Sequence, residues 1–114
     1  MNAKSAYVVH PDTGTVLVNQ NGDVPMGPAS LTKVMTLYLL FDALKQGQVA
    51  MADEFPVSEK AWRMGGSKMF VDVGKTVPVE KLIQGIAVVS GNDACVVKAK
   101  KLGGTEEGFA GLMN

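Results

Sequence analysis

The sequence has few residues of the kinds that form disulfides or bind metal ions. Its 114 residues include one cysteine, Cys95, and one histidine, His10. A single cysteine cannot make an intrachain disulfide, and a single histidine gives no cluster with metal-ligand spacing. A Ser-His-Asp triad would also depend on His10, which directly precedes Pro11 at the end of a predicted strand. We therefore expect no metal and no cofactor, and His10 is poorly placed as a catalytic base.

The sequence also lacks an excess of charge of either sign and any long apolar run. Lysine and arginine total 11, as do aspartate and glutamate, so charge gives no reason to propose a nucleic acid or an anionic membrane as partner. The densest apolar run, 37–41, is far shorter than the roughly 20 residues that a membrane-spanning helix requires. Residues 1–5 lack the apolar core of a signal peptide. We expect no nucleic-acid partner, no membrane-spanning segment and no signal peptide in this chain.

The hydrophobic content, 46%, is that of a single globular domain with a modest core. Residues 5–10 and 15–19 are rich in β-branched and aromatic side chains, and a Pro-Asp-Thr-Gly turn sequence at 11–14 separates them. Proline fixes φ in such a turn and glycine permits a positive φ. The pattern predicts a β-hairpin over 5–19, followed by a loop rich in Asn, Gly and Pro.

The remainder of the chain predicts mainly helices, with short strands within 70–77. Residues 31–46 are apolar on nearly every face and end at Gly47, which is typical of a central, buried helix. Caps and apolar spacing predict further helices at 58–63, 78–89 and 93–102, and a last one that starts at Thr105. On the helix at 93–102 we place the basic residues opposite the apolar stripe, in solvent. These are Lys98, Lys100 and Lys101.

Ser30 and Lys33 form a Ser-x-x-Lys motif at the start of the long apolar helix. Serine is a common N-cap, and a lysine can simply face solvent, so the motif alone is weak. A charge on an otherwise apolar helix, however, has to be paired or neutralised. Positions i and i+3 face the same side of a helix, so a neutral Lys33 amine could take the proton from Ser30. A cap beside a surface charge and a nucleophile beside its base both remain open.

Ser90-Gly91-Asn92 supplies a second hydroxyl and a carboxamide between two predicted helices. A chance Ser-Gly-Asn is expected only about 0.02 to 0.03 times in a chain of this length. The same residues would also suit a plain turn between helices. The motif by itself leaves these two interpretations about even.

Three separated segments resemble one family in the same order. They are PASLTKVMT at 28–36, VSEKAWRMGGSKMF at 57–70 and SGNDACV at 90–96. They resemble the low-molecular-mass penicillin-binding proteins, serine-type D-alanyl-D-alanine carboxypeptidases that trim peptidoglycan stem peptides. The resemblance implies a mixed α/β fold of the β-lactamase/transpeptidase type and a place in the bacterial cell envelope. In that fold the hairpin at 5–19 would be the edge of an antiparallel sheet, and 30–114 the mainly helical region.

The resemblance also implies roles for four residues. Ser30 resembles the nucleophile that attacks the carbonyl of the penultimate D-Ala and forms an acyl-enzyme, and Lys33 resembles its general base. Ser90 resembles the residue that relays a proton to the departing D-Ala amine, and Asn92 the residue that orients the substrate amide. The implied ligands are a peptidoglycan stem peptide or a β-lactam.

One motif of the family has no counterpart in the sequence. The family's Lys-Thr-Gly strand, which holds the substrate carboxylate, is missing, since Lys75-Thr76 is followed by valine and precedes Ser90. Residues 1–114 therefore resemble a single partial domain, roughly the first half of the catalytic domain, with weak or no activity alone. The alternatives are a β-lactamase-type hydrolase and a non-catalytic, truncated or engineered module that self-assembles. Because the hairpin edge is unpaired, we expect a homo-oligomer or a complementing chain.

Overall fold

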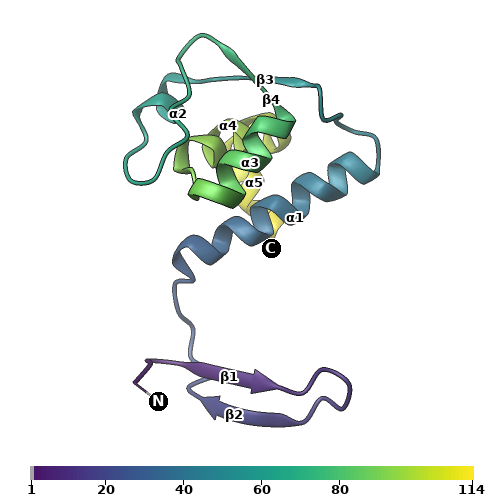
Figure 1. The fold of residues 1–114 in the computed structure, drawn as a ribbon, viewed down its shortest axis with the longest axis vertical. Helices are drawn as coiled ribbons and strands as arrows, with labels where there is room; N and C mark the ends of the chain where they lie inside the picture. The colour runs from purple at the N-terminus through teal and green to yellow at the C-terminus, as the bar shows by residue number, and fades with distance from the viewer. Residues whose placement is uncertain (1) are drawn as a thin grey trace.

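The structure, a computed structural model, describes residues 2–114 and contains the predicted hairpin. Strand β1 (Ala6–Val9) pairs antiparallel with β2 (Val16–Gln20), and the register shifts between Val8 and Val9. Gly14 closes the turn with φ +68, the conformation that glycine was expected to supply. The hairpin lies at one end of the molecule, and an extended segment joins it to the helices (Figure 1).

The rest of the chain is a helical body with one short β-ribbon, so the predicted mixed α/β class is confirmed. Its helices are η1 (Ala29–Leu31), α1 (Thr32–Lys45), α2 (Glu59–Arg63), α3 (Val79–Val89), α4 (Asn92–Gly103) and α5 (Glu106–Met113). Side chains cap two of them as predicted: Ser58 accepts the N–H of Ala61, and Thr105 accepts that of Gly108. Strand β3 (Glu54–Pro56), which the sequence did not predict, pairs antiparallel with β4 (Thr76–Pro78).

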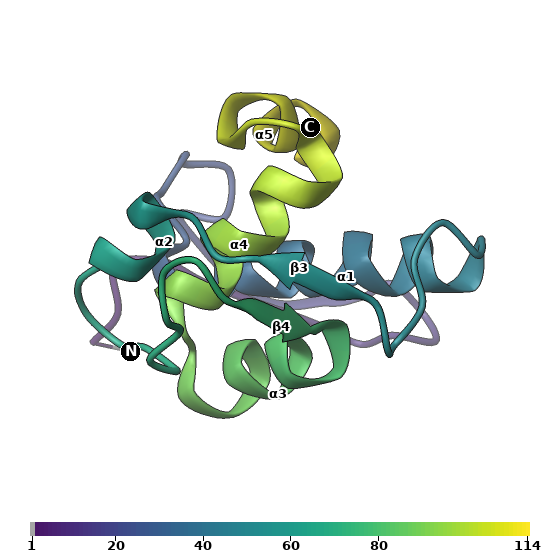
Figure 2. The ribbon, with the colours of Figure 1, turned by 90° about the horizontal axis from the view of Figure 1, so that it is seen from above.

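Helix α4 is the centre of this body. It contacts α1, α2, α3 and α5, and it lies between α3 and α5 when the molecule is seen from above (Figure 2). Its buried Ala94 and Val97 join a core that includes Phe55 of β3 and Leu82 of α3. This packing fixes the start of α4, where the Ser-Gly-Asn turn lies. No helix in the described residues 2–114 is long and apolar enough to cross a membrane.

The prediction that α1 is buried on nearly every face is wrong. Only Thr36, Leu40 and Ala43 are buried in it, whereas Tyr38 is 65% exposed and Phe41 is 50% exposed. The reason is geometric, because α3, α4 and α5 contact α1 on one side. The opposite side of α1 carries an apolar surface that no other element of residues 2–114 covers.

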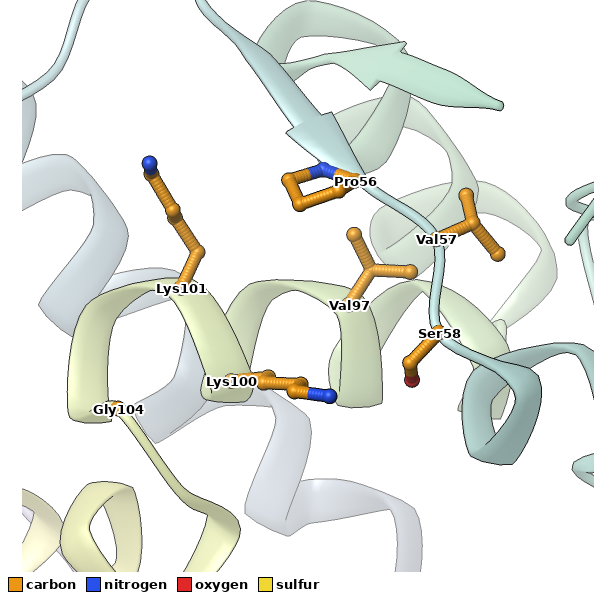
Figure 3. A pocket seen from close by; sticks show the side chains of 7 residues that line it. All are labelled: Pro56, Val57, Ser58, Val97, Lys100, Lys101 and Gly104. Atoms are coloured by element: carbon orange, nitrogen blue, oxygen red, sulfur yellow. The ribbon is translucent and has the colours of Figure 1, made fainter. Parts of the chain in front are cut away.

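The prediction that all three lysines of α4 face solvent is also wrong. Lys100 and Lys101 are exposed and line a hollow against Pro56 and Val97, as Figure 3 shows. Lys98, by contrast, is 0% exposed, and its Nζ lies 4.6 Å from the centre of the Phe109 ring. Helices on several sides of α4 leave too little open surface for three lysines, and α5 covers Lys98.

Candidate active site

The four predicted site residues lie at three helix ends. Ser30 is in η1, directly before α1, and Lys33 is in the first turn of α1. Ser90 ends α3 in the left-handed conformation, with φ 53 and ψ 42, and Asn92 begins α4. The start of α1 and the turn between α3 and α4 lie on the same side of the helical body (Figure 1).

The structure joins the two motifs through one amine. Nζ of the half-buried Lys33 donates to the carbonyl oxygen of Ser90 at 2.6 Å and to its hydroxyl oxygen at 2.9 Å. Because Ser90 ends α3, its carbonyl has no partner inside that helix and can accept a hydrogen bond from the lysine amine. The amine that the sequence places on an apolar helix therefore finds its hydrogen-bond partners in the second motif.

The geometry of Ser30 bears on the two interpretations of the first motif. The residue is exposed, and its hydroxyl has no hydrogen-bond partner within residues 2–114. The N-cap of α1 is Leu31, and no side chain caps that end of the helix. Ser30 thus does not act as a cap. The preceding residue, Ala29, has φ 49, an uncommon conformation for a residue with a side chain.

The segment 65–71 lies against the start of α4 and is fixed there by Asn92. The side-chain amide of Asn92 donates to the carbonyl of Gly65 at 2.8 Å, and its backbone N–H donates to the carbonyl of Ser67 at 2.8 Å. Since the amide nitrogen faces Gly65, the carboxamide oxygen remains available to accept a hydrogen bond from a ligand N–H.

Asp93 is a site residue that the sequence motifs do not indicate, because they place it only at the start of a predicted helix. Its side chain is 1% exposed and accepts hydrogen bonds from the backbone N–H groups of Met69, Val71 and Ala94. Two of these partners lie in segment 65–71, more than twenty residues earlier in the chain. The available signal was an acidic residue in the first helical turn directly after the Ser-Gly-Asn motif.

Cys95 lies near this site but is unsuited to be a second nucleophile. Burial raises the pKa of its thiol, and this effect outweighs the opposing influence of Lys33 and Lys98. The thiolate is the nucleophilic form, so a raised pKa makes Cys95 less reactive. Among residues 2–114, no three His, Cys, Asp or Glu side chains are grouped so as to hold a metal ion.

A Ser-x-x-Lys motif whose lysine contacts a Ser-x-Asn turn, on a mixed α/β scaffold, defines the class of penicillin-recognising serine hydrolases. Within that class the chain belongs to the D-alanyl-D-alanine carboxypeptidase family, Peptidase S11, whose family model matches residues 1–114. The resemblance seen in the sequence is thereby confirmed.

Three relatives show how far the similarity extends. The chain is 45% identical over 112 residues to D-alanyl-D-alanine carboxypeptidase DacF of Bacillus subtilis (strain 168), covering 98% of the chain and 29% of that protein. The crystal structure of DacD from Francisella tularensis matches with a TM-score of 0.92 and 41% identity, over all of the chain and 28% of that structure. Penicillin binding protein 5 of Haemophilus influenzae matches with a TM-score of 0.90 and 39% identity, over 98% of the chain and 33% of that structure. The chain thus spans about three tenths of the length of these relatives.

Proposed function

We propose that this chain carries the nucleophile, base and proton relay of a serine-type D-Ala-D-Ala carboxypeptidase that acts on peptidoglycan stem peptides in the bacterial cell envelope. The observation that carries the proposal is the pair of hydrogen bonds from Lys33 to Ser90. It connects two motifs that lie 57 residues apart, in a chain that belongs to the carboxypeptidase family.

The proposed reaction begins at Ser30. A neutral Lys33 amine takes the proton from the Ser30 hydroxyl, and the oxygen attacks the carbonyl of the penultimate D-Ala. The backbone N–H of Ser30, at the start of α1, stabilises the negative charge that develops on the carbonyl oxygen. As the C–N bond breaks, the proton passes from Lys33 through the Ser90 hydroxyl to the departing D-Ala amine. Water then hydrolyses the acyl-enzyme and releases the shortened peptide.

Asn92 supports this reaction as a substrate-binding residue. Its carboxamide is held by the carbonyl of Gly65, so its oxygen can accept the N–H of the substrate amide and orient the scissile bond. Among the described residues we identify no group that would anchor the substrate carboxylate. We therefore propose that this chain alone hydrolyses D-Ala-D-Ala peptides weakly or not at all, although Ser30 can still be acylated by a β-lactam.

We also propose that the chain associates, either with copies of itself or with a complementing chain. The exposed surface of α1 includes Val34, which is 64% exposed, together with Tyr38 and Phe41. An apolar surface of this kind is typical of an interface. Within residues 2–114, β1 and β2 pair only with each other, so each leaves one strand edge unpaired.

Intact-mass measurement after incubation with a labelled penicillin tests the catalytic proposal. A competent Ser30 gains one covalent adduct, which peptide mapping places on residue 30. The Ser30→Ala variant should gain none, whereas Ser67→Ala, which removes an exposed hydroxyl of segment 65–71, should be labelled like the wild type. An adduct mapped to Ser67 or Ser90 instead of Ser30 would overturn the assignment of the nucleophile.

A further inference from the structure

The buried carboxylate of Asp93 is used by no step of the proposed reaction, yet it has three hydrogen-bond donors. Oδ1 accepts the N–H of Met69 at 3.0 Å and the N–H of Ala94 at 2.8 Å, and Oδ2 accepts the N–H of Val71 at 3.2 Å. Three backbone N–H groups from two separate parts of the chain thus converge on one buried side chain. Asp93 therefore connects the first turn of α4 to the segment 65–71.

The hydrogen bonds of Asp93 fall on alternate residues of that segment. The backbone N–H groups of Met69 and Val71 donate to the carboxylate, and Phe70 lies between these two residues. Phe70 adopts a left-handed backbone with φ 60, and its side chain is 83% exposed. A bulky residue in this region costs about 1 to 3 kcal/mol and persists only where its surroundings impose it. The two hydrogen bonds on either side supply that constraint.

The same segment supplies both partners of Asn92. Gly65 accepts its side-chain N–H and Ser67 accepts its backbone N–H, each at 2.8 Å. The contact at Gly66 is also tight, because a Cβ added there would lie 2.8 Å from the Asn92 amide nitrogen. A displacement of segment 65–71 would therefore change the direction in which the Asn92 carboxamide points.

Segment 65–71 also shapes the surface beside Ser90. Met69 and Phe70 form one wall of a cavity of about 530 Å³ whose other wall is α3, including Val89 next to Ser90. Met69 packs closely on α3, since a Cβ at Gly85 would lie 2.4 Å from its sulfur atom. The segment is thus held between α3 and α4, and the hydrogen bonds to the Asp93 carboxylate attach it to α4.

We infer that Asp93 is a positioning residue: its carboxylate fixes segment 65–71 on α4 and, through that segment, sets the orientation of Asn92 for the substrate amide. The inference rests on the proposed function, because it assigns Asn92 a substrate to orient. The hydrogen bonds of Asp93 within residues 2–114 come from Met69, Val71 and Ala94, and none of them involves Ser30, Lys33 or Ser90.

The test compares Asp93→Asn with a matched control, Asp72→Asn. Asparagine has the same shape as aspartate but keeps only one acceptor oxygen and directs an NH2 group at one of the backbone donors. Asp72 is exposed, directly follows segment 65–71 in the sequence and pairs with Lys75. Its variant therefore makes the same charge change away from α4. Amide hydrogen exchange reports the attachment directly. The N–H groups of Met69 and Val71 should exchange at least about tenfold faster in Asp93→Asn and at the wild-type rate in Asp72→Asn.

Acylation by a labelled penicillin reports the effect on Asn92. We expect the second-order rate constant to fall about tenfold in Asp93→Asn, through weaker binding of the β-lactam amide before reaction. The rate at saturation depends on Lys33 and Ser90 and should stay within about threefold. A merely structural role would instead lower the fraction of protein that becomes labelled and leave both rate constants as they are.

A second pair of variants and a second readout cover the cases in which Asp93→Asn does not fold or the wild-type chain is not acylated. If Asp93→Asn does not fold, Phe70→Gly is compared with Phe70→Gly/Asp93→Asn, since glycine adopts a positive φ without the strain of Phe70. If the wild-type chain gains no adduct, the proposed function fails for this chain, and the exchange rates still decide the role of Asp93. Unchanged protection of Met69 and Val71 in a folded Asp93→Asn protein would overturn the inference.

Discussion

The amine of Lys33 donates hydrogen bonds to both oxygens of Ser90, at 2.6 Å to the carbonyl and 2.9 Å to the hydroxyl. The carbonyl bond anchors the amine, and the hydroxyl bond is the one along which the proposed proton relay would run. This arrangement needs a residue that ends a helix in the left-handed conformation, which Ser90 does with φ 53. One lysine thus joins α1 to the turn between α3 and α4.

The first prediction concerns Lys33→Met, which keeps most of the side-chain length and removes the amine. We expect acylation of Ser30 by a labelled penicillin to be lost, because the hydroxyl then has no base. The free energy of unfolding should fall by only about 1 to 2 kcal/mol, since Ser90 is partly open to water and can bind solvent instead. Intact-mass labelling and urea unfolding measure the two effects.

The control for this variant is Lys45→Met, which removes an exposed charge from the last turn of the same helix. It should be labelled like the wild type. Wild-type labelling of Lys33→Met would show that Lys33 is not the base.

The second prediction is that this chain alone turns over D-Ala-D-Ala peptides very slowly. Among residues 2–114 we identify the Ser30 N–H as an oxyanion donor but no second one, and the lack of one such donor typically costs about 10² to 10³ in rate. The lack of an identified carboxylate anchor adds to that cost. The chain covers 29% of the length of its Bacillus subtilis relative. Release of D-Ala from a synthetic peptide, with a full-length relative measured alongside, checks this. Equal turnover by the two proteins would contradict it.

The third prediction follows from the burial of Lys98. Burial lowers the pKa of its amine from the ordinary 10.5 to about 7, so the folded state binds fewer protons than the unfolded state between these values. Stability then rises with pH across that window, and the cost of the charge is present in full below pH 7. Lys98→Met should therefore stabilise the protein most below pH 7, by on the order of 1 to 3 kcal/mol, and progressively less toward pH 10.

Urea unfolding of Lys98→Met and the wild type at pH 6, 8 and 10 measures this difference. Lys100→Met is the matched control, because Lys100 is exposed on the same helix. Its difference from the wild type should not depend on pH. A Lys98→Met difference that is equally flat would show that the amine stays charged, or reaches water, in the folded protein.

The sequence predicted the elements whose signals are local, and it did less well where distant contacts decide. The hairpin turn at 11–14 and the caps at Ser58 and Thr105 lie within a few residues of the structure they produce. Two short motifs also indicated four candidate site residues, whose roles stay a prediction. Lys98, in contrast, lies on a helix whose exposed side is set by where α5 packs, and periodicity along α4 alone could not show that.

Asp93 illustrates the same limit at the site. Its partners, Met69 and Val71, are in a segment without regular structure, and no repeat in the sequence connects them to α4. The exposure of α1 is a further case. An apolar helix predicts that something covers it, but the pattern does not say whether the cover comes from this chain or from another.

The last prediction concerns that uncovered surface. Tyr38 and Phe41 lie on the side of α1 that no other element of residues 2–114 covers, at 65% and 50% exposure. The hairpin adds Leu17, which is 62% exposed, beside strand edges that pair with nothing in the described chain. Removing such surfaces from water favours association, and closed two-fold dimers are the commonest result. We expect a concentration-dependent homodimer in sedimentation across a dilution series.

Tyr38→Lys/Phe41→Lys should shift the equilibrium to monomer, because two desolvated charges would face each other across the interface. Val88→Lys, which changes an 80% exposed apolar residue on α3, should leave it unchanged. A folded wild-type chain that stays monomeric at every concentration would contradict the prediction, as would equal effects of the α1 and α3 variants.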